Sequence, residues 1–275
     1  MVLDNEIFEQ ALTLFHRYSL QNDCLFEKMT ELGILPKDRD PGLSVFDIGA
    51  GQGHLPDLIR PHVGKLILLE PNRRCVDVLS KRFEHIYPCP WNAEALERVR
   101  TDHPGGFDLV TMSHMLYHFQ GIDDIHEKIM LSLSSVNAGG NLVIAVNQPS
   151  APTSKAGVRF QMEEGRLDEF RTNHDLLDIV NDSGFFSELS DQGFDVSIYP
   201  LDTPLKGVSD REELVMLFRM PLLNPLSDSP CDLRKIDGFI SDFIDSQFPD
   251  LCYPATIPSM DNMICFCNRG TCNER

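Results

Sequence analysis

The sequence has little positive charge for its length. Across its 275 residues, 24 lysine and arginine residues stand against 42 acidic residues, which gives a formal net charge of −18 at pH 7. Nucleic-acid-binding proteins need clustered basic side chains to displace counterions from phosphates, and an anionic membrane surface would repel so acidic a chain. The composition therefore argues against nucleic-acid and membrane partners.

Long apolar runs and a targeting signal are also missing. No apolar run approaches the ~20 residues that a membrane-spanning helix needs. The first ten residues, MVLDNEIFEQ, carry acids instead of the basic and then apolar layout of a signal peptide. We therefore expect a cytoplasmic protein whose eight cysteines are reduced thiols.

Three of the cysteines form a C-x-C-x4-C cluster: Cys265, Cys267 and Cys272. A structural zinc site would want a fourth ligand, usually with C-x2-C spacing. Alternation along a strand explains Cys265 and Cys267 equally well, since both would point to one face. No metal site is predicted.

Hydrophobic periodicity predicts a helical start followed by alternating strands and helices. Apolar residues recur at helical spacing over residues 5–33, and a charged, breaker-rich linker follows at 36–42. We expect strands at 43–48, 65–69, 107–112 and 141–146, with a weaker one at 85–87, and helices near 54–62, 73–83, 93–100 and 123–136. Such alternation is typical of a doubly wound α/β fold, in which helices cover both faces of a parallel sheet.

After residue 149 this alternation ends. A loop rich in Pro, Ser and Gly precedes a helix expected at about 173–183, and a strand is expected at 194–199. Ser209 with Glu212 has the pattern of a capping box for a helix at about 210–219. A further helix is expected at about 232–247 and a last strand at 262–267. The extra helices between the two late strands look like an insertion that walls a pocket.

The most informative motif is a strand followed by alternating glycines. The strand VFDI, residues 45–48, contains Asp47 and runs into a turn of Gly49, Ala50, Gly51, Gln52 and Gly53. Glycine lets the backbone turn sharply and lets a ligand approach closely, and the helix start that follows exposes free N–H groups. A dinucleotide site needs G-x-G-x-x-G, so the alternating spacing favours S-adenosylmethionine over NAD.

A second strand ends in an acid. Glu70 follows the apolar run LILL, lies 19 residues after Gly51, and is followed by Pro71. A carboxylate at this place can accept hydrogen bonds from both hydroxyls of a ribose, although an acid is also common in a plain strand-end turn. We predict that Glu70 and Pro71 border the sugar of the cofactor.

The turn after the weak third strand reads Trp-Asn-Ala-Glu-Ala from Trp91 onward. In folds of this kind the turn borders the adenine, so Asn92, Ala93 and Glu94 are candidate contacts of the base. Trp91 itself is either a core aromatic or a neighbour of the base.

The fourth strand is expected to end near Met112, which places residues 113–118 at the carboxyl edge of the sheet. Ser113 is predicted to contact the cofactor. His114 or His118 could remove a proton from an acceptor, because an unperturbed histidine titrates near ~6.5. The alternative for both histidines is a hydrogen bond within a loop.

These motifs, in this order and spacing, resemble those of class I S-adenosylmethionine-dependent methyltransferases over about residues 43–147. The resemblance implies a Rossmann-like, doubly wound seven-stranded sheet whose last strand is antiparallel, with S-adenosylmethionine as cofactor. It divides the chain into a helical substrate and lid segment at 1–42, a cofactor-binding α/β core at 43–150, and the remaining strands with a pocket-forming helical insertion at 151–275.

A narrower resemblance, spanning almost the whole chain, is to the histamine N-methyltransferase family. Residues 15–24 are similar to that family's first substrate-contacting helix, and residues 114–117 to its Gln-Met-Leu-Tyr. The family's amine-binding Glu, Gln and Asn correspond here to Gln21, His114 and Asn262, so two of the three differ and the acceptor is expected not to be histamine. The resemblance implies substrate contacts from Tyr18, Gln21, His114, Tyr117 and Asn262.

The sequence thus predicts a monomeric or weakly dimeric methyltransferase that transfers a methyl group to a nitrogen or oxygen of a small molecule. Two alternatives stay open. One is a methyltransferase-like protein that keeps the cofactor fold for binding or regulation without turnover. The other is an NAD-dependent oxidoreductase, which the glycine spacing disfavours.

Overall fold

The computed structural model describes residues 5–119, 121–165, 183–222 and 232–270. These residues fall into two compact units. The helical unit comprises the described residues of Met1–Gln21, Asn147–His174 and Asp202–Asp261, and the sheet unit comprises those of Asn22–Val146, Asp175–Leu201 and Asn262–Arg275. The helix predicted at about 173–183 lies almost wholly outside the described residues, as do Cys231 and Cys272.

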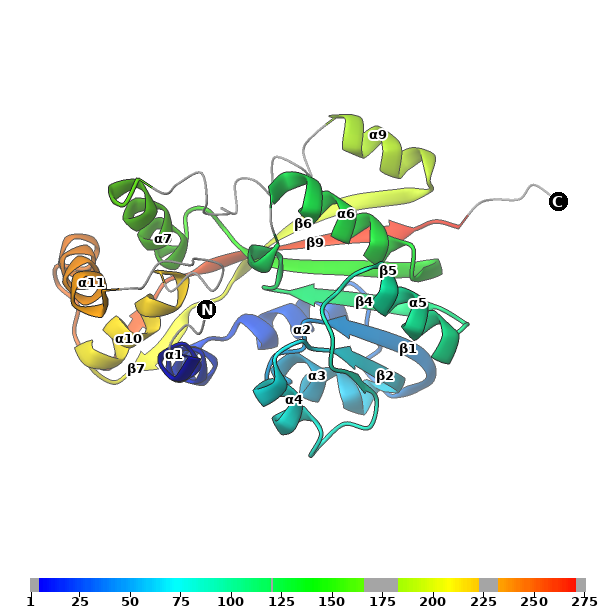
Figure 1. Cartoon of the computed structure of the whole chain (residues 1–275), viewed down its shortest axis with the longest axis horizontal. Helices are drawn as coiled ribbons and strands as arrows, with labels where there is room; N and C mark the ends of the chain where they lie inside the picture. The colour runs from blue at the N-terminus through cyan, green and yellow to red at the C-terminus, as the bar shows by residue number, and fades with distance from the viewer. Residues whose placement is uncertain (1–4, 120, 166–182, 223–231, 271–275) are drawn as a thin grey trace. The chain divides into compact units, whose positions relative to one another are not determined.

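The sheet unit is built on a seven-stranded sheet with the order β3-β2-β1-β4-β5-β9-β6 (Figure 1). Its strands are β1 (Asp40–Ile48), β2 (Val63–Leu69), β3 (Ile86–Tyr87), β4 (Phe107–Ser113), β5 (Val136–Asn147), β6 (Phe194–Asp202) and β9 (Met260–Asn268). The first five pair in parallel, with β1 between β2 and β4. Each strand predicted from the sequence is present, and most are longer than the apolar run that indicated them.

Strand β9 runs against its two neighbours. At its end, the Asn268 side chain donates to the carbonyl of Val136, the first residue of β5, at 3.2 Å. The next N–H, that of Arg269, donates to the carbonyl of Gly193 beside the start of β6, at 2.8 Å. The end of β9 therefore lies by the starts of β5 and β6. The sheet is mixed, and the seven-stranded doubly wound fold is confirmed.

Helices cover both faces of this sheet because successive strand residues point to opposite sides. Phe46 packs in a core with residues of α5 (Ala93–Asp102), α6 (Gly121–Leu133) and α9 (Ser183–Asp191). Its neighbour Val45 packs in a second core with residues of α2 (Gln21–Glu31) and α3 (His54–Ile59). A smaller cluster joins α4 (Arg73–Leu79) to the loop after β1 through Leu79 and Ala50.

The helical unit has a separate core. Its helices are α1 (Asn5–Tyr18), α7 (Pro152–Glu163), α10 (Arg211–Leu222) and α11 (Leu233–Gln247). They pack with a two-stranded antiparallel sheet of β7 (Leu205–Val208) and β8 (Ala255–Ile257). The helix predicted at 232–247 is present as α11 and buries one face in this core, where Ile240 and Phe243 meet Phe218 of α10.

The segment 5–33, predicted as helical, forms α1 and α2 with a break at Ser19, which forms an antiparallel bridge with Leu205. Two local predictions were wrong. The loop predicted after residue 149 contains α7. The capping box is shifted by one residue, because Asp210 Oδ1 accepts from the Glu213 N–H at 2.9 Å and Glu213 Oε2 accepts from the Ser209 N–H at 3.2 Å.

Within the ranges that the structure describes, no helix combines the length and apolarity needed to cross a bilayer. In the same ranges, no group of three or more His, Cys, Asp or Glu side chains is arranged to hold a metal ion. Cys265 of β9 is buried and Cys267 is half-buried, and Cys265 Sγ contacts Asn141 Oδ1 at 3.6 Å.

Candidate functional site

The glycine loop joins the end of β1 to the start of α3. Gly49, Gly51 and Gly53 have φ values of 80°, 54° and 86°, in the left-handed region that side chains rarely adopt. The N–H groups of Gly49 and Ala50 both donate to the carbonyl of Leu69 at the end of β2, at 2.8 and 3.1 Å. The loop is therefore fixed to the carboxyl edge of the parallel strands.

The three glycines have different surroundings. A Cβ on Gly49 would lie 3.0 Å from Met115 Cβ, and a Cβ on Gly53 would lie 2.6 Å from Leu79 Cδ2. A Cβ on Gly51 would have no atom within 4 Å. The outer glycines let the loop pass close to its neighbours, while the middle glycine leaves bare backbone beside open space.

Glu70 holds the middle of this loop. Glu70 as a whole is only 6% exposed. Oε2 accepts from the Gly51 N–H and Oε1 from the Asn72 N–H, both at 2.7 Å. Burial raises the pKa of Glu70, and the two backbone hydrogen bonds oppose that rise. Each carboxylate oxygen can accept more than one hydrogen bond, so Glu70 keeps acceptor capacity for hydroxyl groups beside Gly51. Pro71, which follows it, is exposed.

Asp47 lies beneath the loop, in β1. Its carboxyl group is 2% exposed and accepts from the hydroxyl of Thr111, its register partner on β4. Burial raises the pKa of Asp47 to about 7, the Thr111 bond lowers it, and the charge of Glu70 raises it. The group therefore changes charge near neutral pH. The sequence motif pointed to Asp47 but gave no sign of Thr111.

The loop after β4 lies against the glycine loop. Met115 fills the space beside Gly49, and the 3₁₀ turn Leu116–His118 follows it. His114 has a φ of 54°, and its N–H donates to the carbonyl of Ala145 on β5 at 2.9 Å. Its ring stacks on Tyr117 with centroids 6.3 Å apart. Ser113, His114 and Tyr117 are half-buried, and His118 is exposed.

A left-handed backbone is uncommon at a residue with a side chain, and it persists where the surrounding structure enforces it. Here the bond to Ala145 enforces it. Such outliers often mark functional sites, which makes His114 the more informative of the two candidate histidines.

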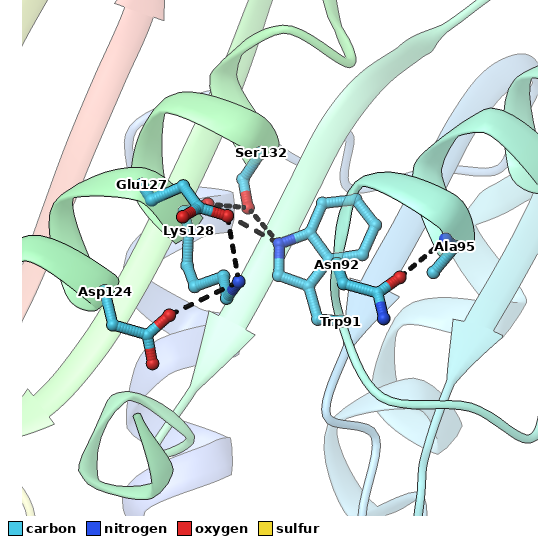
Figure 2. A network of polar contacts seen from close by, with 7 residues as sticks. All are labelled: Trp91, Asn92, Ala95, Asp124, Glu127, Lys128 and Ser132. Atoms are coloured by element: carbon cyan, nitrogen blue, oxygen red, sulfur yellow. Dashed lines mark hydrogen bonds and ion pairs between the residues drawn. The ribbon is translucent and has the colours of Figure 1, made fainter. Parts of the chain in front are cut away.

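The candidate adenine turn has two different parts (Figure 2). Trp91 is a core residue, 4% exposed, whose indole N–H donates to Ser132 Oγ on α6 at 3.1 Å. Asn92 begins α5, and its side-chain oxygen accepts from the Ala95 N–H at 2.8 Å. Ala93 and Glu94 are exposed in the first turn of α5. Of the two readings of Trp91, its environment fits the core aromatic.

The predicted acceptor contacts divide between the two units. His114, Tyr117 and the buried Asn262 belong to the sheet unit, whereas Tyr18 and Gln21 belong to the helical unit. The Tyr18 hydroxyl donates to Glu213 Oε2 at 2.6 Å and lies 3.0 Å from Ser209 Oγ.

Gln21 joins a polar cluster of the helical unit. Gln21 Nε2 donates to Asn147 Oδ1 at 2.9 Å and lies 3.4 Å from Asp261 Oδ1, which is 1% exposed. Asn147 and Asp261 were not found from the sequence. The only available signal was the position of Asp261 beside the predicted Asn262.

Comparison with known proteins assigns the family. Residues 18–196 match a family model described as a methyltransferase domain, and this match spans more than half of the chain. The chain belongs to the methyltransferase domain family. A search of curated proteins finds no match for this methyltransferase.

Solved structures share its fold at low sequence identity. A Bacillus halodurans C-125 protein assigned as a methyltransferase has a TM-score of 0.52 and 16% identity, covering 89% of this chain and 99% of its own. The YcgJ protein of Bacillus subtilis has a TM-score of 0.52 and 17% identity, with the same coverage. The plantazolicin methyltransferase BamL, solved in complex with a triazolic desmethylPZN analog and S-adenosylhomocysteine, has a TM-score of 0.51 and 12% identity, covering 95% of this chain and 90% of its own.

The family, the class I fold and the complete G-x-G-x-G loop support S-adenosylmethionine as the cofactor of this methyltransferase. The residues present fit that molecule. Bare backbone at Gly51 allows close approach, and the buried carboxylate of Glu70 beside it can accept from hydroxyl groups.

Proposed function

We propose that this methyltransferase transfers the methyl group of S-adenosylmethionine to a nitrogen or oxygen of a small-molecule acceptor. The observation that carries the proposal is the pairing of Gly51 with Glu70. The backbone of Gly51 is bare, and its N–H is held by a buried carboxylate that retains acceptor positions. Asp47, Gly49, Ala50, Gly53, Pro71, Asn92, Ala93, Glu94 and Ser113 are the further cofactor contacts proposed.

S-adenosylmethionine, when bound, supplies a methyl group that is already activated on a sulfonium sulfur. The side chains of the protein therefore mainly orient the acceptor and set its protonation state. Orientation can lower a barrier by several kcal/mol, up to about 7–11 in ideal cases.

His114 is the proposed acceptor-side residue with a catalytic role. It lies at the carboxyl edge of the sheet, on a loop that packs against the glycine loop through Met115. Its imidazole can accept a proton from a hydroxyl, amine or imidazole acceptor. His118, which is exposed, is the second candidate for this proton transfer.

The acceptor is proposed not to be histamine. Gln21 and His114 stand where the histamine N-methyltransferase family has Glu and Gln, while Asn262 is kept. An uncharged Gln21 amide cannot pair with an ammonium group as a carboxylate does. Tyr18 and Tyr117 are proposed to complete the acceptor contacts.

Calorimetry with S-adenosylhomocysteine tests the cofactor half of the proposal. We expect micromolar binding by the wild type, and a loss of at least tenfold in Glu70→Ala, since one charged hydrogen-bonding partner contributes about 1.5–3 kcal/mol. Glu84→Ala is the matched control, because Glu84 is an exposed carboxylate in the same unit. No heat with either cofactor form would rule the proposal out.

Turnover separates this proposal from a silent methyltransferase-like protein. The wild type should move label from a methyl-labelled donor into compounds of a metabolite pool, and His114→Ala should reduce this transfer while S-adenosylhomocysteine still binds. Cofactor binding without any labelled product would favour the silent alternative.

A further inference from the structure

The end of α4 forms the outer wall of the glycine loop. A Cβ on Gly53 would lie 2.6 Å from Leu79 Cδ2, 3.0 Å from Arg82 Nη2 and 3.1 Å from Phe83 Cε2. Leu79 and Phe83 also share an apolar cluster with Ala50 of the loop. The loop thus has a packed outer side, formed by α4 and the turn after it, and an open side at Gly51.

Arg82 has three partners here, one each in the glycine loop, in α3 and in the wall. Its Nη2 donates to the carbonyl oxygen of Gln52, and its Nη1 pairs with the carboxylate of Asp57 in the first turn of α3. Its guanidinium carbon also lies over the Phe83 ring, 5.4 Å from the ring centroid. The planar fork of arginine can serve both acceptors at once, which a single ammonium cannot do in the same geometry.

The bond to Gln52 fixes one peptide plane of the loop. The carbonyl of Gln52 and the N–H of Gly53 belong to the same planar unit and point in opposite directions. Arg82 holds the oxygen, and the Gly53 N–H donates to the carbonyl of Ala50 at 2.9 Å. The plane is therefore held on both sides, next to the Gly51 N–H that Glu70 holds.

We propose that Arg82 is a positioning residue for the cofactor: it fixes the Gln52–Gly53 peptide so that the open backbone at Gly51 is preorganised for binding. This inference rests on the proposed function of the loop. A segment with three glycines has many accessible conformations, so without Arg82 part of the binding free energy is spent on ordering the loop.

The energetic signature should be an effect on binding much larger than the effect on stability. The side chains of Arg82 and Asp57 are 33% and 36% exposed, and ion pairs at such sites contribute little to folding. Removal of Arg82 should therefore leave the protein folded while the loop samples conformations that do not bind.

Arg82→Gln is the test variant. We expect its Kd for S-adenosylhomocysteine and its KM for S-adenosylmethionine to rise roughly tenfold, as for loss of one charged hydrogen bond. The value of kcat at saturating cofactor should change less than about twofold, because the lost contact affects binding and transition state equally. Arg82→Lys should recover part of the affinity.

Arg60→Gln is the matched control. Arg60 lies over the same Phe83 ring and 3.9 Å from the same Asp57 carboxylate, but it donates to the carbonyl of Arg82 instead of the loop. We expect its cofactor Kd to stay within about twofold of the wild type. Equal affinity losses in the two variants, or an unchanged Kd in Arg82→Gln, would overturn the inference.

Two further outcomes distinguish a failure of the proposed function from a failure of the positioning role. A wild type that does not bind S-adenosylhomocysteine would overturn the proposed function itself. A wild type that binds, together with an Arg82→Gln variant whose affinity loss matches a comparable fall in Tm, would assign Arg82 a structural role only and overturn the positioning role.

Discussion

The two units assemble their polar groups in different ways. In the sheet unit, Asp47, Glu70 and His114 follow one another along a single stretch of chain, and each stands at or near a strand end. In the helical unit, hydrogen bonds join residues far apart in sequence: Tyr18 to Glu213 across 195 positions, and Gln21 to Asn147 across 126. The polar groups of the sheet unit are thus placed by successive strand ends, and those of the helical unit by contacts between distant segments.

The largest effect on stability is expected at Gly53, in the loop of the sheet unit. Gly53→Ala places a methyl group against Leu79 in a left-handed backbone and should lower the free energy of unfolding by about 2–4 kcal/mol. Gly51→Ala has the same kind of backbone but open space, so it should lower it by only about 1–2 kcal/mol while weakening cofactor binding. Urea unfolding and calorimetry measure both. Equal destabilisation by the two changes would contradict the distinction between packed and open glycines.

A second effect concerns Asp47 and pH. Its pKa is about 7 in the folded protein against an ordinary value of 3.8 for aspartate, so the folded state keeps a proton that the unfolded chain loses first. Stability should therefore fall as pH rises from about 4 to 7 and level off above pH 7. One pKa unit corresponds to about 1.4 kcal/mol, so the change amounts to a few kcal/mol.

The Asp47→Asn variant has an amide in place of the carboxyl group, so position 47 does not titrate in it. Its free energy of unfolding relative to the wild type should increase across pH 4–7 and stay constant at higher pH. Urea titrations at several pH values give this difference, and other carboxylates cancel because both proteins share them. A difference that does not depend on pH would mean that Asp47 is charged throughout.

A smaller effect is expected in the helical unit. Tyr18→Phe removes the hydroxyl that donates to Glu213 and contacts Ser209, and should lower stability by about 1 kcal/mol. If residues of the sheet unit alone bind the cofactor, the Kd for S-adenosylhomocysteine should remain within about twofold of the wild-type value while the KM for the acceptor rises. Isothermal calorimetry and steady-state kinetics on the same preparation would test this. A large change in the cofactor Kd would contradict the assignment of cofactor binding to the sheet unit.

The smallest stability effect is expected at His114, with a change of opposite sign. His114→Gly relieves the left-handed backbone and should raise the free energy of unfolding by about 0.5–1 kcal/mol. Turnover should nevertheless fall about a hundredfold if the imidazole handles a proton. Thermal unfolding and single-turnover kinetics give the two values. Unchanged turnover in a stabilised variant would reduce His114 to a loop residue.

The sequence predicted the conformation of the glycine loop well because the requirements of such a loop are local. Alternating glycines after a strand demand a left-handed loop, and Gly49, Gly51 and Gly53 all adopt it. Glu70 follows a buried strand and meets Gly51 as the parallel topology requires. The contact of Thr111 with Asp47 depends on strand register, which one sequence does not specify.

The helical unit was predicted less well because its features depend on contacts between segments far apart in the sequence. The segment that forms α7 was predicted as a loop because of its Pro, Ser and Gly residues, yet Pro152 stands at the first position of the helix, where proline is well suited. The break at Ser19 contains neither glycine nor proline and depends on the distant Leu205. The polar cluster of Gln21, Asn147 and Asp261 combines three separate segments, so no local pattern marks it.

The position of β9 has a consequence for how the chain folds during its synthesis. β9 is the last of the seven strands in chain order, yet it lies between β5 and β6. Until it emerges from the ribosome, β5 presents an unpaired edge and β6 has no neighbour to join. A nascent chain that still lacks β9 therefore has an incomplete sheet, and the pairing of β5 with β9 and of β9 with β6 can form only late in synthesis.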